Sequence, residues 1–172
     1  MGISKEAFEK TQGFARIHPG EDPDLSHRIR KAGFTTTFLP GAHVYHKRRI
    51  SWKKFYQQVT KFGTVRPILN RWHPEGAKIT FWFPSLFVIF AVGSVLGALL
   101  WKWQLIVPMA LYVMAIWVHA SFKTRSLVIG TLSVAALFIQ FFGYGWAFLK
   151  SSFFIGWLKK DPEQHYPKLF FN

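Results

Sequence analysis

Three carboxylates stand close together at Glu21, Asp22 and Asp24, in a chain that has only 8 Asp and Glu residues among 172. An ionised carboxylate can accept the proton of an attacking hydroxyl group, so the cluster is a candidate for general-base catalysis. A structural explanation is also available, because Asp is a good helix N-cap and acidic groups are favourable in a first helical turn. That explanation leaves Glu21 without a role, since it only adds like charge beside Asp22. Both explanations stay open at this point.

A short helix is expected to position this cluster. Asp22 suits the N-cap, and Pro23 suits the first helical position, where a missing N–H costs nothing. Leu25 and Ile29 begin an apolar stripe with helical spacing, and Gly33 can end the helix. The carboxylates would then lie at the N-terminal end of this helix.

Two short strands are expected after the helix. Residues 34–38 alternate and are rich in β-forming side chains, and residues 42–46 predict a second strand. Because successive side chains of a strand point to opposite faces, His43 and His46 cannot together grip one metal ion. The helix and strands together predict a small α+β unit.

Three stretches follow one another along this part of the chain: residues 1–14, the run 20–34 that holds the Glu-Asp pair, and the run 44–49. In this order and at this spacing they resemble the acceptor-side half of the catalytic domain of a family 2 glycosyltransferase, over about residues 1–63. The resemblance implies a GT-A-like fold. It also implies transfer of a sugar from a nucleotide-sugar donor to a hydroxyl acceptor, with inversion at the anomeric carbon.

The resemblance assigns roles to individual residues. The Asp of the family's Glu-Asp pair is the general base, which maps to Asp22, with Glu21 beside it in the catalytic pair. Glu21 and Asp24 would shape the site that binds the acceptor substrate. The family's histidine after the next strand is often a ligand of the divalent metal on the sugar nucleotide, Mg²⁺ or Mn²⁺, which maps to His46. Without the resemblance, a surface or packed histidine would be the ordinary interpretation of His46.

Arg48 and Arg49 follow this histidine closely. Arginine makes two-pronged contacts with phosphate, so both are candidates for binding the substrate's leaving diphosphate. The alternative is that they belong to the basic residues that ordinarily flank the cytosolic face of a membrane protein.

The resemblance also indicates what the chain lacks. Enzymes of this family begin with a nucleotide-binding α/β half that ends in an Asp-x-Asp motif, and this chain begins after that point. Asp22-Pro23-Asp24 has the residue types of this motif but not its expected structural setting, because it opens a helix and no buried strand leads into it. We therefore expect a fragment that is inactive alone. Its donor site and metal would come with the missing half, or with a partner chain.

Charge is distributed unevenly along the chain. Lys and Arg number 22 against 8 Asp and Glu, and 15 of these basic residues fall within positions 1–78. A basic segment beside an apolar one indicates an anionic lipid surface or a phosphate-bearing substrate rather than nucleic acid. The absence of cysteine excludes disulfides and cysteine metal sites.

Three later stretches lack Asp, Glu, Lys and Arg and reach the roughly 20 residues that a membrane-spanning helix needs. They are residues 79–101, 103–122 and 126–149. Before them, Ser51 is expected to begin a helix that ends at Gly63, followed by an interfacial connector over 64–78. The predicted division is a partial catalytic domain (1–63), the connector, transmembrane helices (79–149) and an interfacial C-terminal segment (150–172).

The topology of the third stretch stays open. If the catalytic part is cytosolic, a third crossing would place Lys150, Lys159 and Lys160 outside, against the positive-inside rule. Either this stretch does not cross fully, with a break at Gly143-Tyr144-Gly145, or residues 153–158 return the chain.

The sequence thus predicts an α-rich, multi-pass membrane protein with a small α+β catalytic fragment and about three transmembrane helices. Its expected function is that of a membrane-bound glycosyltransferase that acts on a glycan or lipid-linked acceptor. The alternative is a non-catalytic membrane protein whose basic interfacial surface binds anionic lipid or a partner subunit.

Overall fold

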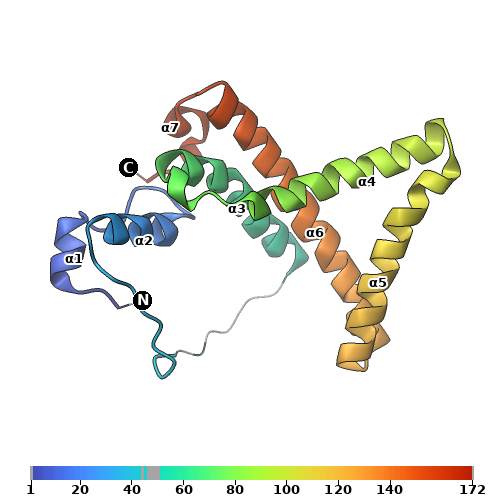
Figure 1. Cartoon of the computed structure of the whole chain (residues 1–172), viewed down its shortest axis with the longest axis horizontal. Helices are drawn as coiled ribbons and strands as arrows, with labels where there is room; N and C mark the ends of the chain where they lie inside the picture. The colour runs from blue at the N-terminus through green and yellow to red at the C-terminus, as the bar shows by residue number, and fades with distance from the viewer. Residues whose placement is uncertain (1, 44, 46–50, 172) are drawn as a thin grey trace.

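The structure is a computed structural model that describes residues 2–43, 45 and 51–171 (Figure 1). Its helices are α1 (Lys5–Lys10), α2 (Glu21–Lys31), α3 (Trp52–Trp72), α4 (Phe83–Leu100), α5 (Val107–Thr124), α6 (Leu127–Ser151) and α7 (Pro162–His165). Short 3-10 turns, Ile79–Trp82 and Trp103–Ile106, lead into α4 and α5, and a π-helical segment, Ser152–Trp157, continues α6. Helices α3, α4 and α5 all pack against α6.

Helix α2 begins earlier than the sequence predicts. Its N-cap is Gly20, so Asp22 stands inside the first turn and Pro23 follows it. The prediction of Asp22 as N-cap is therefore wrong. The reason is tertiary: Gly20 has a φ of 129°, and a Cβ at this position would approach Val65 Cγ1 of α3 to 2.7 Å. Close packing against α3, rather than side-chain capping, decides where α2 starts.

The predicted strands are not found. Residues 34–38 and the described residues 42, 43 and 45 have no regular structure, and the described ranges contain no sheet. The α+β part of the predicted fold is thus not confirmed. Phe38 and Leu39 are largely exposed, and a strand is stable only when a neighbour satisfies its backbone groups and covers one face.

Helix α3 begins where the sequence predicts, with the Ser51 hydroxyl accepting a 3.2 Å hydrogen bond from the Lys54 N–H. It then runs on through Gly63 to Trp72, so residues 64–72 of the expected connector are helical. Gly63 does not end the helix. A Cβ at this position would overlap the backbone carbonyl of Tyr144, so the glycine allows α3 and α6 to cross closely.

Close helix contacts also explain Gly143 and Gly145 of α6. A Cβ on Gly143 would approach Val59 Cγ2 of α3 to 2.7 Å, and one on Gly145 would collide with the Pro84 carbonyl of α4. The Ser85 hydroxyl donates a 3.0 Å hydrogen bond to the Gly145 carbonyl. Small residues at such crossings let helix backbones approach in an apolar environment. The expected break at Gly143-Tyr144-Gly145 is therefore wrong, because α6 is continuous there.

The loop before α2 and the C-terminal tail both pack against α3. The loop before α2 forms an antiparallel bridge with the C-terminal tail at Ile17 and Phe170. The N–H of His18 donates to the Leu169 carbonyl at 2.7 Å. At the end of α3, Arg71 Nη1 donates to the Lys160 carbonyl at 3.0 Å. A buried cluster holds these parts together: Ile17, Val65, Ile68, Leu69, Ile155 and Leu169.

Three helical stretches are long and apolar enough to cross a membrane: Ile79–Leu100, Trp103–Thr124 and Leu127–Trp157. As Figure 1 shows, α4 leads away from α6 and α5 returns to it. The contacts of Ile17 and Arg71 hold the C-terminal tail against the loop before α2 and the end of α3. A returning segment at residues 153–158 is also wrong, since residues 152–157 continue α6.

The close crossing of α3 and α6 can be tested by adding one methyl group. Gly63→Ala is expected to lower the free energy of unfolding by about 1–3 kcal/mol through overpacking, measured by thermal unfolding in detergent. Alanine favours helix over glycine, so a loss of stability reports the clash. Gly93→Ala on α4 is the matched control, because nothing lies within 4 Å of a Cβ there. Equal stability of the two variants would contradict the proposed close crossing.

Candidate functional site

A cavity of about 240 Å³ lies between the N-terminal end of α2 and the middle of α3. The predicted catalytic pair, Glu21 and Asp22, lines one side, and Phe62 and Arg66 of α3 line another. A second hollow of about 350 Å³ shares His18, Pro19 and Phe62 with it and adds Lys54, Gln57, Gln58 and Lys61. The two hollows together place two carboxylates opposite a basic, amide-bearing face of α3.

Glu21 is held in place by a histidine. Its Oε1 accepts a 2.8 Å hydrogen bond from His18 Nδ1, whereas Oε2 is buried and has no hydrogen-bond partner among the residues that the structure describes. Burial raises the pKa of Glu21, but backbone N–H groups and His18 lower the pKa by more, so it lies below its usual value. The side chain is therefore an ionised carboxylate whose unpaired oxygen is buried.

Asp22 is exposed and lines the same cavity. A hydroxyl group of a bound substrate could reach its carboxylate from this space, as a general base requires. Carboxylate oxygens are also ligands that Mg²⁺ and Mn²⁺ accept, so Glu21 and Asp22 are chemically compatible with the ion that the family resemblance implies. His46, Arg48 and Arg49 lie outside the described residues, and their roles stay predictions.

Asp24 differs from its two neighbours because it is buried. Its Oδ2 accepts a 2.8 Å hydrogen bond from Arg28 Nε and lies 2.7 Å from Arg28 Nη2 in an ion pair, and its Oδ1 accepts a 2.8 Å hydrogen bond from His73 Nε2. Arg28 also donates to the carbonyls of Thr11 and Gly13. Asp24 is not among the residues that line the cavity. In the structure it connects α2 with the loop after α1 and with the end of α3.

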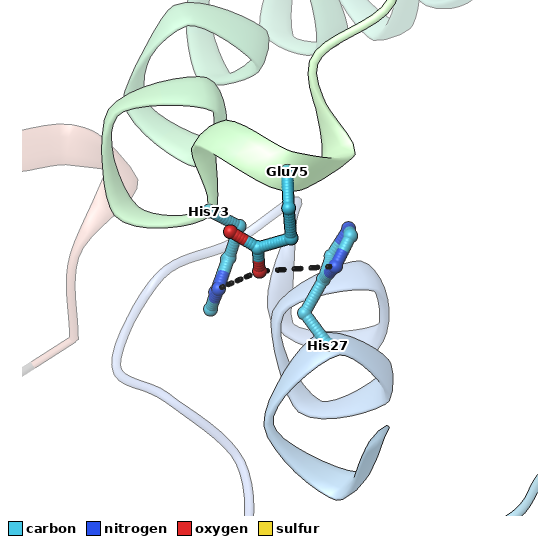
Figure 2. Close-up of side chains that lie close together, drawn as sticks. All are labelled: His27, His73 and Glu75. Carbon is cyan, nitrogen blue, oxygen red and sulfur yellow. Dashed lines mark ion pairs between the residues drawn. The ribbon is translucent and has the colours of Figure 1, made fainter. Parts of the chain in front are cut away.

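A second cluster, which sequence analysis missed, lies beside Asp24 and is shown in Figure 2. Glu75 Oε1 lies 3.9 Å from His27 Nδ1, 3.7 Å from His73 Nδ1 and 3.0 Å from Lys31 Nζ. The two imidazoles are stacked, with centroids 4.8 Å apart and planes 11° apart. No local motif signals this cluster, since His27 lies on α2 and the other two follow α3.

Electrostatics within the cluster favour neutral His27 and ionised Glu75. Burial lowers the pKa of His27, and the neighbouring His73 and Arg30 lower it further. A hydrogen bond from its own backbone N–H lowers the pKa of Glu75, and the contact with Lys31 adds to this effect.

A family model described as glycosyl transferase family group 2 matches residues 1–150, and the chain therefore belongs to this family. The match extends far beyond residue 63 and takes in α3, α4, α5 and nearly all of α6. The apolar helices are thus part of the family unit. A search of curated proteins and a search of solved structures each gave no match.

The different settings of Asp22 and Asp24 lead to opposite expectations for the same substitution. Asp24→Asn removes the charge that pairs with Arg28 and is expected to cost about 3–5 kcal/mol of unfolding free energy, as for other broken buried ion pairs. Asp22→Asn, at an exposed carboxylate, is the matched control and should leave the midpoint of thermal unfolding nearly unchanged. A stable Asp24→Asn variant would show that the buried pair does not hold these segments together.

Proposed function

We propose that this chain forms the acceptor-binding, membrane-embedded part of a glycosyltransferase. The reaction would transfer a sugar from a nucleotide-sugar donor to a hydroxyl group of a glycan or lipid-linked acceptor. Membership of the family supports the reaction class. The observation that carries the proposal is the pair Glu21 and Asp22 at a cavity faced by basic residues of α3.

In the proposed mechanism Asp22 takes the proton of the acceptor hydroxyl as its oxygen attacks the anomeric carbon. The new carbon–oxygen bond forms in line with the breaking bond to the nucleoside diphosphate, which leaves with the bonding electrons, so the configuration at that carbon inverts. The Glu21 carboxylate lines the same cavity, is oriented by His18 and is proposed to hold a second acceptor hydroxyl. Substrate hydroxyls held in this way align the attacking oxygen.

The negative charge of the leaving diphosphate needs positive partners. Lys54, Lys61 and Arg66 face the two hollows from α3, and Arg48 and Arg49 are proposed to contribute beside them. A divalent Mg²⁺ or Mn²⁺ ion, with His46 as a proposed ligand, would supply further charge neutralisation when the donor is bound. The nucleotide-binding half is proposed to lie outside the described residues, in the same polypeptide or in a partner chain.

We propose that the catalytic part faces the cytosol. The contacts of the tail with the end of α3 support this proposal, because they keep Lys159 and Lys160 close to the helix that carries Lys54 and Lys61. Such a concentration of basic residues on one side is typical of the cytosolic side.

Asp22→Asn in an enzyme that contains both halves is expected to lower kcat about 10²–10⁴-fold, because the general base is lost. The thermal midpoint should stay near that of the wild type. The measurement is transfer of labelled sugar into the acceptor fraction. Glu9→Gln, an exposed carboxylate of α1, is the control and should keep wild-type turnover. Near-wild-type turnover of the Asp22 variant would remove the catalytic assignment.

A second candidate function, binding of anionic lipid by a non-catalytic membrane protein, is favoured by another cavity. This cavity of about 860 Å³ lies between the C-terminal part of α3 and the end of α6. Its wall is mainly apolar, with Phe148, Trp82 and Trp157, and it carries the cations Arg71 and Lys159. Tryptophan and basic side chains together are typical of the headgroup region of a membrane.

Phosphatidylglycerol added to the detergent-solubilised chain is expected to raise its thermal midpoint more than phosphatidylcholine does, since only the former carries net charge. Lys159→Gln should reduce this difference. Lys5→Gln, at an exposed residue of α1 that does not line the cavity, should preserve it. Equal effects of the two lipids on the wild type would argue against a lipid site and leave a partner subunit as the alternative occupant of this surface.

A further inference from the structure

We propose that His27, His73 and Glu75 form a binding site for a divalent transition-metal ion of the zinc class. The site is separate from the cavity lined by Asp22 and does not depend on the proposed transferase activity. It would join α2 to the turn that follows α3.

The three side chains already surround one point. One ligand atom from each lies within 4.8 Å of the others. Both imidazole Nδ1 atoms face the same oxygen of Glu75, at 3.9 and 3.7 Å, as the dashed lines in Figure 2 show. Ligand atoms bound tetrahedrally at about 2.0–2.1 Å from zinc are roughly 3.4 Å apart. Each distance to Glu75 therefore needs to shorten by only a few tenths of an ångström. The two imidazoles, whose planes are 11° apart, must also tilt out of their stacked arrangement so that both nitrogen lone pairs meet at the ion.

Asp24 prepares His73 to act as a ligand. Asp24 Oδ1 accepts the Nε2 proton of His73 at 2.8 Å, which leaves the lone pair of Nδ1 on the side of Glu75. A carboxylate behind a histidine fixes the tautomer and the ring orientation of metal ligands in this way, and raises their basicity. His73 is 6% exposed at its side chain, so burial also restricts its rotation.

His27 is held by the turn itself. A Cβ on Gly76 would approach His27 Nε2 to 2.6 Å, so this glycine lies directly against the imidazole. The Nδ1 atom of His27 remains turned toward Glu75. The two stacked rings and the carboxylate thus reach the site from two separate segments, and a bound ion would link those segments.

Lys31 currently supplies the positive charge at this place. Its Nζ lies 3.0 Å from Glu75 Oε1 and 3.4 Å from His73 Nδ1, the same two atoms that a metal ion would use. The Lys31 side chain is 52% exposed, so its ammonium can swing into solvent when an ion arrives. The structure therefore assigns Lys31 the role of a competitor for the site.

The donor set decides the class of ion. Two imidazole nitrogens and one carboxylate oxygen suit Zn²⁺, or Co²⁺ as its spectroscopic substitute, better than Mg²⁺ or Ca²⁺, which prefer all-oxygen ligands. Three protein ligands leave a fourth position for water. The ion would stabilise the contact between α2 and the turn at residues 73–76.

The test uses the full, untagged chain in detergent, titrated with ZnCl₂ by calorimetry and with CoCl₂ by visible absorption. Lys31→Met removes the competing ammonium and is expected to raise Zn²⁺ affinity at least about tenfold. His27→Ala and Glu75→Gln are expected to lower it by at least about 10–100-fold, because the loss of even an outer-shell partner of a metal ligand costs this much. His119→Ala, at an exposed histidine on α5, is the matched control and should bind as the wild type does.

Thermal unfolding without metal verifies that each variant is folded before its affinity is compared. Co²⁺ bands that are typical of nitrogen and oxygen ligation in the Lys31→Met protein, and that are lost with His27→Ala, would support the site. The proposal is overturned if neither the wild type nor Lys31→Met binds Zn²⁺ saturably. It is also overturned if His27→Ala and Glu75→Gln bind as tightly as the wild type, because another histidine would then hold the ion.

Discussion

The buried carboxylate of Asp24 is the interaction on which the polar half of the molecule depends. Its two oxygens engage Arg28 on the same helix and His73 beyond the end of α3, and Arg28 continues the network to the carbonyls after α1. A charge placed in such surroundings is tolerated only when it is paired and hydrogen-bonded, so the partners cannot be exchanged independently. The network holds α2 at a defined place. The position of the cavity at the start of α2 therefore depends on the same network.

The apolar half depends on a different constraint, which is close contact between helix backbones. Gly63, Gly143 and Gly145 remove side chains where α3, α6 and α4 cross, and the hydroxyl of Ser85 bonds to a carbonyl exposed by that approach. These crossings bring the end of α6 to the end of α3. They explain why the tail lies beside the N-terminal half.

The neighbouring acidic residues at the start of α2 have different surroundings. Glu21 and Asp22 line the cavity, whereas Asp24 turns inward and serves the fold. Helical geometry explains part of this difference, because residues two positions apart on a helix point in different directions. The rest comes from Arg28 and His73, which pair with the Asp24 carboxylate and so allow it to be buried. Asp24 therefore has a structural role, although not the helix-capping role that the sequence suggested, and the catalytic role of Glu21 and Asp22 stays a proposal.

Sequence alone determined the family, the three long apolar helices, the start of α3 at Ser51 and the closeness of Glu21 and Asp22, because these depend on neighbours within a few residues or on continuous composition. Tertiary structure decided the rest. His73 meets Asp24 across 49 positions of sequence, Gly20 replaces Asp22 as N-cap because of Val65, and residues 34–38 have no neighbouring strand with which to pair. Such outcomes depend on which distant segment supplies a partner. A local sequence pattern does not identify that segment.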